Sequence, residues 1–284
     1  MASERDIKLR IRSVRNIQQI TKAMKMVASA RIRKVETQAK ASRPYARKLQ
    51  AVVQELTAQM DGASHPLMEV RPVRRVGVLV VTSDKGLCGS YNSNLLRLTH
   101  ASLADLPGGA PARLVVVGNK GRRYFQRRRY EVDRVYGGWN PEVSLARELA
   151  ALCTEWFLGG EVDEIRCYYT RAVSMLVQTP TEERILPLAG PEGEEVRPLP
   201  YLFEPGPEQA LDQILPRYLQ IILHQVLLES RTSELGARLR AMTNATDNAD
   251  KLASELTLEF FRIRQENITT EILEISSGAE ALKG

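Results

Sequence analysis

The sequence predicts an α/β protein in which two long terminal helices pair as an antiparallel coiled coil and flank a central Rossmann-like α/β domain. Three observations predict this fold. Apolar residues recur at heptad spacing near both ends of the chain, short β-branched runs alternate with helical stretches between them, and aromatic residues make up only 6% of the 284 residues. We expect four parts: an N-terminal helix at 1–61, the α/β domain at 73–190, a proline-rich connector at 191–207 and a C-terminal helix at 208–284.

The N-terminal helix is predicted to begin at Ser3, with Asp6 three residues later in the capping-box position. We expect Pro44 to kink the helix without ending it. Its apolar positions step by three and four residues, and from Ile32 onward they form a heptad seam that needs a helical partner. They are Ile7, Ile11, Val14, Ile17, Ile20, Met24 and Val27, followed by Ile32, Val35, Ala39, Ser42, Ala46, Leu49, Val53, Leu56 and Met60.

The middle of the chain alternates strands with helices, as expected of an α/β domain. Strands are predicted at 75–82, 113–117 and 162–169, with a hairpin of 173–179 and 184–188. Helical stretches are predicted at 95–103 and 121–128. A further helix should start with Asn140 as its N-cap and Pro141 as its first residue, and should end at Gly159.

The C-terminal helix is expected to begin with Pro216 as its first residue, after a connector that holds six prolines in 187–207. It would run to Leu282, roughly 100 Å at about 1.5 Å per residue. Such a helix is too long for a compact domain, so the two terminal seams are expected to pack against each other. This second seam comprises Leu235, Leu239, Met242, Ala249, Leu252, Leu256, Ile263, Ile268, Ile272, Ile275, Ala279 and Leu282.

Charge is distributed unevenly along the chain. Residues 3–48 hold 14 Lys and Arg against 3 Asp and Glu, whereas the residues from 205 onward hold 12 acidic against 8 basic. A basic helix could lie along DNA phosphates, so a basic coiled-coil nucleic-acid-binding protein is the alternative function. Against it, the cations fall at every heptad angle, and no aromatic residue precedes Tyr45.

Neither a catalytic site, a cofactor site nor a metal site is expected. The glycines Gly86 and Gly89 follow a predicted strand, but the sequence has no GxxxxGK[ST] and no GxGxxG phosphate loop. The three cysteines, Cys88, Cys153 and Cys167, are widely spaced without a CxxC pair, which favours a reducing compartment over a disulfide framework or a zinc site. No apolar run approaches the ~18 residues of a membrane span.

The polar segment MTNATDNA at 242–249 is unusual inside a helix. Two interpretations stay open: small side chains could allow the paired helix to approach closely, or the segment could present a polar surface to another protein.

Three motifs resemble those of F-type ATP synthase gamma subunits: ITKAMKMVA at 20–28, TSDKGLCG at 82–89 and ITTEILEISSGAEA at 268–281. The resemblance implies the central rotor shaft of a proton-translocating enzyme, without catalysis of its own. It implies as partners the ring of alpha and beta subunits, the epsilon subunit and the membrane c-ring. The location implied is the cytoplasmic face of a bacterial cell membrane, as a peripheral protein.

The resemblance also implies contact residues. In the family an Arg-Gln pair before the C-terminal motif bonds to loops of the beta subunit, and Arg264 and Gln265 occupy that place here, with Thr269 and Glu271 one or two turns further on. Further candidates for a surface facing a partner are Lys22, Met24 and Lys25 in the N-terminal motif.

Overall fold

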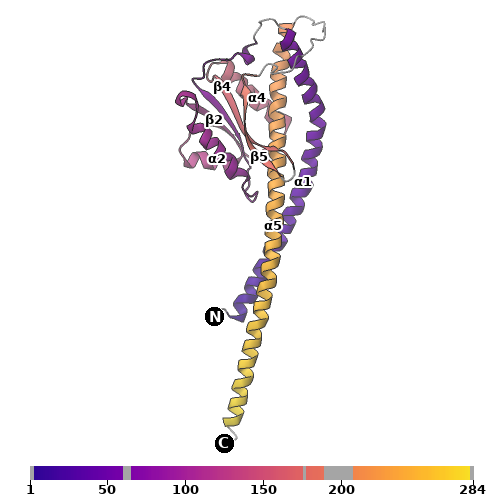
Figure 1. Ribbon diagram of the computed structural model, residues 1–284, viewed down its shortest axis with the longest axis vertical. Helices are drawn as coiled ribbons and strands as arrows, with labels where there is room; N and C mark the ends of the chain where they lie inside the picture. Colours follow the sequence, from indigo (N-terminus) through magenta and orange to yellow (C-terminus); the bar gives the residue numbers. More distant parts are fainter. Residues whose placement is uncertain (1–2, 60–64, 175–176, 189–206, 282–284) are drawn as a thin grey trace. The chain divides into compact units, whose positions relative to one another are not determined.

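The computed structural model describes residues 3–59, 65–174, 177–188 and 207–281. They form two compact units: a sheet unit of residues 29–238, and a rod unit that combines the residues up to 28 with those from 239 onward. Two long helices, α1 (Glu4–Gln59) and α5 (Pro207–Ala281), contribute to both units (Figure 1). The predicted connector at 191–207 lies outside the described residues, except for residue 207, and so do Met60, Asp61 and Leu282.

The sheet unit is built on one five-stranded sheet with the strand order β3-β2-β1-β4-β5. The strands are β1 (Val76–Val81), β2 (Ala112–Val117), β3 (Val132–Tyr136), β4 (Glu164–Ala172) and β5 (Gln178–Leu186). Strand β1 is central and runs parallel to both β2 and β4, with β3 parallel to β2 and β5 antiparallel to β4. This topology confirms the predicted Rossmann-like α/β fold.

Two features of the sheet differ from the sequence-based prediction. Strand β3 was not predicted, because Asp133 and Arg134 interrupt the apolar residues of VDRVY, and the strand is mostly exposed at this edge of the sheet. The predicted hairpin is wrong: β4 pairs directly with β5, and the Ser174 N–H donates to the Val177 carbonyl in the turn between them. Strand β5 contains Pro180, which is tolerated there because β5 lies at the edge of the sheet.

Helices cover both faces of the sheet. On one face, α2 (Tyr91–Ala104) and α3 (Asn119–Arg127) pack on the β1 residues Val76, Val78 and Val80. On the other face, Leu79 and Val81 of β1 share a core with α4 (Val143–Leu158), α5 and the end of α1. Strand β1 is therefore buried on both sides, as its apolar run predicts. Two short 3-10 helices, η1 (Pro66–Met68) and η2 (Pro107–Gly109), complete the described elements.

Helix α4 begins later than predicted. Glu142 remains extended as the N-cap, so Asn140 and Pro141 precede the helix instead of starting it. The predicted end is confirmed, since Gly159 is the C-cap residue and its N–H donates to the Glu155 carbonyl at 2.9 Å.

Helix α1 begins with the predicted capping box. The Asp6 N–H donates to Ser3 Oγ at 3.3 Å, and the Ser3 N–H donates back to Asp6 Oδ2 at 3.2 Å. The Ser3 hydroxyl also donates to Asp6 Oδ2 at 2.9 Å, and this bond, together with the one from the Ser3 N–H, lowers the pKa of the Asp6 carboxyl. The helix continues through Pro44 without ending, as predicted.

The α1 seam is confirmed within the sheet unit but only partly within the rod unit. From Ile32 to Leu56 every predicted position is buried or half-buried. In the rod unit, Ile17, Ile20 and Val27 are exposed, and the packed row passes through Gln18 and Thr21 instead. The helical period of 3.6 places these polar residues, and not their apolar neighbours, on the face toward α5.

Helix α5 is one continuous helix with Pro216 inside it, so the prediction that Pro216 starts the helix is wrong. An internal proline costs about 3 kcal/mol. Each buried leucine contributes about 1.5–3 kcal/mol, and four of them flank this position on one face: Leu211, Leu215, Leu219 and Leu223. Tertiary packing therefore outweighs the local effect of the proline.

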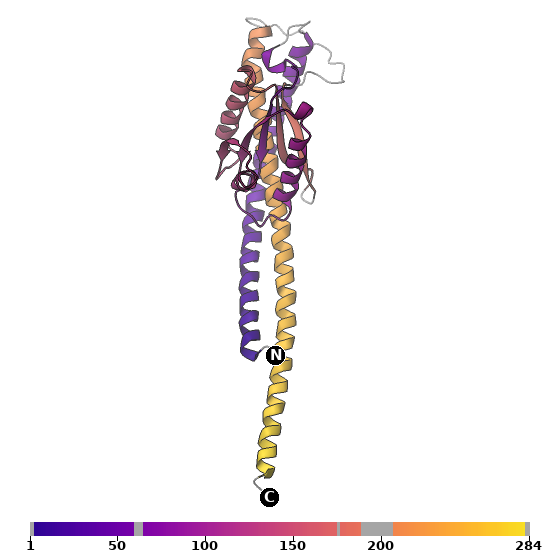
Figure 2. The ribbon, with the colours of Figure 1, turned by 90° about the vertical axis from the view of Figure 1, so that its left-hand side faces the viewer.

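The predicted C-terminal seam is wrong in its last third. Met242 and Ala249 are buried as expected, but Leu252 is exposed and Ala253 is buried in its place. Leu256 and Ile263 are half-buried, but the later predicted positions Ile268, Ile272, Ile275 and Ala279 are exposed. In the rod unit, α5 extends beyond the start of α1, so these residues have no helix of their own chain to meet (Figures 1 and 2).

Candidate partner-binding site

Two polar contacts fix the register of α1 and α5 in the rod unit. Gln18 Nε2 donates to Asp250 Oδ1 at 2.9 Å, and Thr246 Oγ1 donates to Thr21 Oγ1 at 2.8 Å. Because the helices are antiparallel, each step forward on α5 corresponds to one step back on α1. Arg264 of α5 therefore lies level with the first turn of α1.

The polar segment at 242–249 has a packed face and an exposed polar face. Met242 and Ala249 are buried and Thr246 contacts α1, which fits close packing by small residues. On the opposite side Asp247 and Asn248 are exposed, so this side offers a polar surface. The helical period separates the two faces, and contact of the polar face with another protein stays a prediction.

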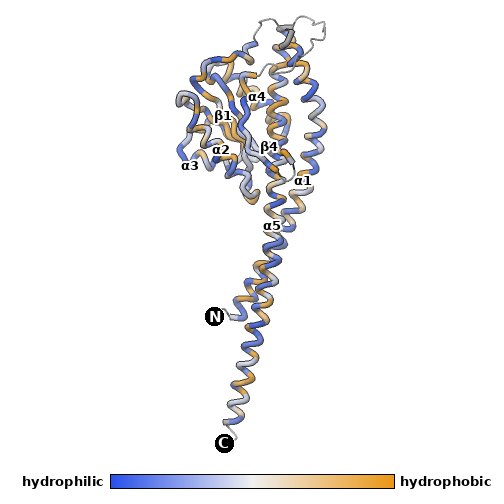
Figure 3. The backbone as a smooth tube through the Cα atoms, in the orientation of Figure 1, coloured by the Kyte–Doolittle hydropathy of each residue, from blue (hydrophilic) through white to orange (hydrophobic). Residues whose placement is uncertain are grey.

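The C-terminal end of α5 is a single helix whose side chains lie in solvent. Every residue from Arg264 to Glu280 is exposed, and this stretch covers about 25 Å of helix. It alternates hydrophilic and hydrophobic residues (Figure 3). The exposed fractions of its large apolar residues are 45% for Ile268, 60% for Ile272, 61% for Leu273 and 73% for Ile275. We call residues 264–281 the free end.

All four predicted beta-contact residues lie on the free end. The Thr269 hydroxyl donates to the Gln265 carbonyl at 2.8 Å, which holds that side chain against its own helix. Arg264 and Glu271 make no ion pair within the described part of the chain, whereas the neighbouring Arg262 pairs with Glu266 at 3.2 Å. The charged groups of Arg264 and Glu271 are thus available to bind a partner.

The second predicted set lies elsewhere on the rod unit. Lys22 is exposed, while Met24 and Lys25 are half-buried. By the register above, this part of α1 is level with residues 243–246 of α5, about 30 Å along the helix pair from Arg264. The structure therefore separates the two sets into two surfaces instead of bringing them together.

The TSDKGLCG segment forms a structural loop at the carboxyl ends of the parallel strands. The Asp84 carboxylate accepts from the Asn119 N–H (3.1 Å), the Asn119 side-chain amide (2.8 Å), the Gly138 N–H (2.9 Å) and the Trp139 N–H (3.1 Å). In dinucleotide-binding folds, amides at this edge hold a phosphate. Here the protein's own carboxylate already occupies them, which argues against a nucleotide at this edge.

A buried polar joint ties this loop to α5 within the sheet unit. The Glu234 carboxylate accepts from Arg231 Nη1 at 2.7 Å and from Arg238 Nη1 at 2.6 Å. Arg238 also donates to the carbonyls of Lys85 and Gly86, each at 3.2 Å. We call Arg231, Glu234 and Arg238 the α5 triad. The triad was not predicted from the sequence, although its i, i+3 and i+7 spacing places all three residues on one helix face.

A further hydrogen bond, made by Tyr91, connects α2 to α5. The Tyr91 hydroxyl lies 2.7 Å from Ser230 Oγ, and burial raises its pKa. Burial likewise raises the pKa of the Cys88 thiol beside it. Both groups therefore remain protonated and serve packing.

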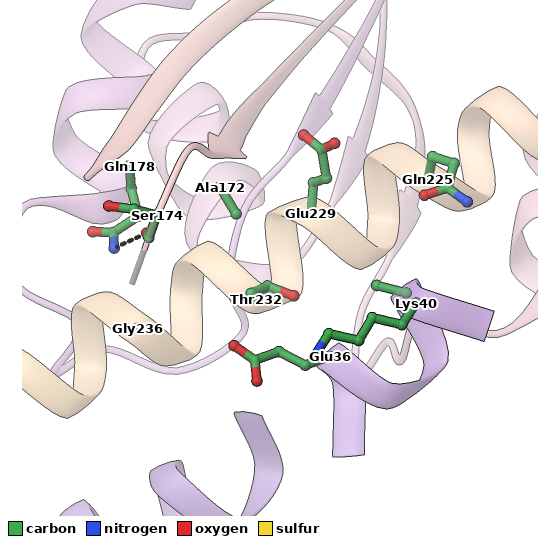
Figure 4. Close-up of a pocket in the computed structure, with 10 residues that line it drawn as sticks. Glu36, Lys40, Ala172, Ser174, Gln178, Gln225, Glu229, Thr232 and Gly236 are labelled. Carbon is green, nitrogen blue, oxygen red and sulfur yellow. Dashed lines mark hydrogen bonds between the residues drawn. The ribbon is translucent and has the colours of Figure 1, made fainter. Parts of the chain in front are cut away.

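A small pocket lies between α1, α5 and the β4–β5 turn (Figure 4). Its volume is about 230 Å³, and Glu36, Lys40, Glu229 and Thr232 are among its lining residues. Its serine, Ser174, accepts the Val177 N–H at 3.0 Å within the turn.

The described residues hold neither a metal-binding cluster nor a helix that could span a membrane. They contain no group of three or more His, Cys, Asp and Glu that could hold a metal ion. Of the helices they form, none is apolar enough over a sufficient length to cross a membrane.

Comparisons with known proteins agree along the whole chain. The family model described as ATP synthase matches residues 3–282. The ATP synthase gamma chain of Moorella thermoacetica is 48% identical over 285 residues, and that of Desulfitobacterium hafniense is 45% identical, each with 100% of both chains covered.

Solved structures show the same fold. A chain in the Euglena gracilis mitochondrial ATP synthase OSCP/F1/c-ring structure has a TM-score of 0.71 at 19% identity and covers 98% of this chain and 94% of its own. A chain in the central stalk/c-ring structure of the Tetrahymena thermophila enzyme has a TM-score of 0.60 at 21% identity, with 80% and 99% covered. Full-length identity to curated relatives, together with the two helices and the sheet between them, shows that this chain belongs to the ATP synthase gamma chain family.

Proposed function

We propose that this chain is the non-catalytic rotor shaft of a proton-translocating F-type ATP synthase. It couples rotation of the c-ring to conformational changes at the catalytic sites of the beta subunits. The observation that carries the proposal is the free end, a solvated helix with four exposed isoleucine and leucine side chains. A single helix without tertiary packing is only marginally stable in water. This end is therefore suited to a surrounding protein partner.

The partners follow from the family and from the charges of the two surfaces. We propose that the free end enters the ring of alpha and beta subunits, where Arg264, Gln265, Thr269 and Glu271 contact loops of the beta subunit. Lys22, Met24 and Lys25 form a second contact surface, about 30 Å away along the helix pair. The sheet unit sits beside the epsilon subunit and the membrane c-ring. The chain is then peripheral to a bacterial cell membrane, on its cytoplasmic face.

Two observations favour a shaft over the nucleic-acid-binding alternative. The exposed apolar residues of the free end suit a protein partner, whereas a DNA-binding surface is polar and strongly positive. In addition, the curated relatives that match over the full length are named ATP synthase gamma chains.

Co-expression with alpha and beta subunits tests the proposal. The full chain should form a stable complex that hydrolyses ATP, while the chain alone should not hydrolyse it. A chain shortened to end at Leu256 lacks the free end, so it should assemble less well and produce less torque. Undiminished assembly and torque with the shortened chain, or ATP hydrolysis by the chain alone, would refute the shaft role.

A further inference from the structure

A strongly basic cleft lies between α2 and α3 of the sheet unit. Its volume is about 590 Å³, and five of its nine lining residues are cationic while none is acidic. The lining residues are Asn92, Ser93, Leu96, Arg97, Lys120, Arg123, Tyr124, Arg127 and Arg128. We call this the basic cleft.

The cations of the basic cleft have no counter-charge. Elsewhere in the sheet unit, arginines such as Arg113, Arg166 and Arg171 form ion pairs with carboxylates. Among the ion pairs of the described residues, none involves a cation of the basic cleft. Arg128 instead lies over the Tyr124 ring, with its Cζ 3.8 Å from the ring centroid. This stacking orients a guanidinium while its charge stays unneutralised.

Helix stability does not explain these charges. Helix α3 has only 9 residues and no acidic residue in its first turn, where the helix dipole favours acidic side chains. Lys120 and Arg122 stand there instead. Positive charge at this end opposes the dipole, and the nearby cations repel one another. Residues that destabilise the helix in which they lie indicate a function outside that helix.

The spacing of the cations indicates what could neutralise them. Lys120, Arg123 and Arg127 stand at i, i+3 and i+7, along one face of α3. Acidic residues at the same spacing on a partner helix would meet them one by one, because both rows repeat every ~4.5–6 Å. Guanidinium groups bind carboxylates through paired hydrogen bonds. We propose that the basic cleft binds an acidic segment of a protein partner, with its carboxylates at helical spacing.

Phosphate ligands fit the cleft less well. Helix α3 is only about 13 Å long, so at about 3.4 Å of duplex axis per phosphate it spans only about four phosphates of one nucleic acid strand. Four of the five cations are exposed and follow the helices instead of converging on one point, as a small phosphate ligand would require. The proposal goes beyond the shaft function and does not depend on it.

Binding of a designed peptide by the full chain tests the proposal. The probe is a fluorescent alanine-based peptide whose glutamates are three and four residues apart, and its glutamine counterpart serves as the uncharged control. The native chain should bind the glutamate peptide in a salt-sensitive way. The triple substitution Arg97→Gln, Arg123→Gln and Arg127→Gln should weaken binding by about tenfold or more. Circular dichroism checks its fold, and the single substitution Arg97→Gln serves if the triple fails to fold.

A second triple substitution controls for net charge. Arg134→Gln, Arg147→Gln and Arg184→Gln remove the same charge from exposed positions outside the cleft, and binding should stay close to that of the native chain. Equal weakening by both triples would overturn the proposal, as would failure of the native chain to bind the peptide. Tighter binding of pyrophosphate or of a short DNA duplex than of the peptide, lost in the cleft triple, would overturn it in favour of a phosphate ligand.

Discussion

Replacing Glu234 with alanine should destabilise the sheet unit by about 3–5 kcal/mol, because it removes one partner from a buried ion cluster. The Glu234 side chain is only 1% exposed, and those of Arg231 and Arg238 are 13% and 11% exposed. Without the carboxylate, two nearly buried guanidiniums would remain without a counter-charge. A loss of this size is a large part of a typical total stability of about 5–15 kcal/mol.

The same substitution should loosen the loop that Arg238 holds. Cys88 is buried in that loop and gives a local signal, because its thiol reacts with a labelling reagent only when the loop opens. If opening becomes about 3 kcal/mol easier, Cys88 should be labelled roughly 100-fold faster. Thermal unfolding of the full chain measures the global effect, and mass spectrometry of the labelled peptides measures the local one.

Glu266→Ala is the matched control. Glu266 pairs with Arg262 at the same i, i+4 spacing that joins Glu234 to Arg238, but those two side chains are 56% and 81% exposed. An exposed pair of this kind contributes only about 0.3–0.5 kcal/mol. Two results would contradict the prediction. If Glu234→Ala shifts the unfolding temperature no more than Glu266→Ala does, the buried triad does not stabilise the sheet unit. If Cys88 labelling is unchanged, the triad does not hold the loop.

Three further predictions concern the assembled enzyme and the response to pH and oxidants. Arg264→Ala with Gln265→Ala should lower ATP turnover of the complex at least about tenfold while assembly persists, since the charged hydrogen bond of Arg264 alone is worth about 1.5–3 kcal/mol; normal turnover would remove their contact role. Burial lowers the pKa of His224, although its bond to the Pro141 carbonyl opposes the shift, so the unfolded chain takes up more protons below about pH 6.5 and stability should fall there. His224→Gln should reduce that fall in pH-dependent denaturation, and an unchanged pH profile would contradict the assignment. Burial raises the pKa of Cys153 to about 12 and also raises the pKa values of Cys88 and Cys167. A raised pKa keeps a thiol in its unreactive protonated form, so dithiol reductants should leave ATPase activity unchanged. A reversible activation by reductant that maps to one of these cysteines would contradict this prediction.

Sequence patterns predicted those elements in which local and tertiary preferences agree. The β1 run is apolar on both faces and is buried on both, and the heptads from Ile32 to Leu56 mark a packed seam. Predictions failed where tertiary packing outweighs a local signal. Pro216 does not start α5 because leucines on both sides bury the helix around it. Strand β3 was missed because an edge strand can be polar and still complete a ladder.

The contact residues show a different kind of limit. Ile268, Ile272 and Ile275 have the spacing of a seam whether the partner is the same chain or another one. The register of the two helices in the rod unit shows that the partner is not α1. The first residue of α1, Glu4, lies level with Arg264, so α1 does not extend alongside the three isoleucines. The α5 triad was missed because its carboxylate bridges two arginines of its own helix, a pattern that on most helices is an exposed charge pair.

If the chain is a shaft, the α5 triad should hold the loop in place without carrying most of the load. A proton crossing ~100 mV supplies ~2.3 kcal/mol, and several combine for each ATP, so each step transmits on the order of 10 kcal/mol. One charged hydrogen bond contributes about 1.5–3 kcal/mol. The apolar core that joins α5 to the sheet buries many more groups, including Leu211, Leu219 and Leu227. We therefore expect Glu234→Gln, which keeps the shape of the side chain, to preserve most of the torque in single-molecule rotation of the complex. A torque close to zero in this variant, with assembly intact, would show that the α5 triad and not the apolar core transmits the force.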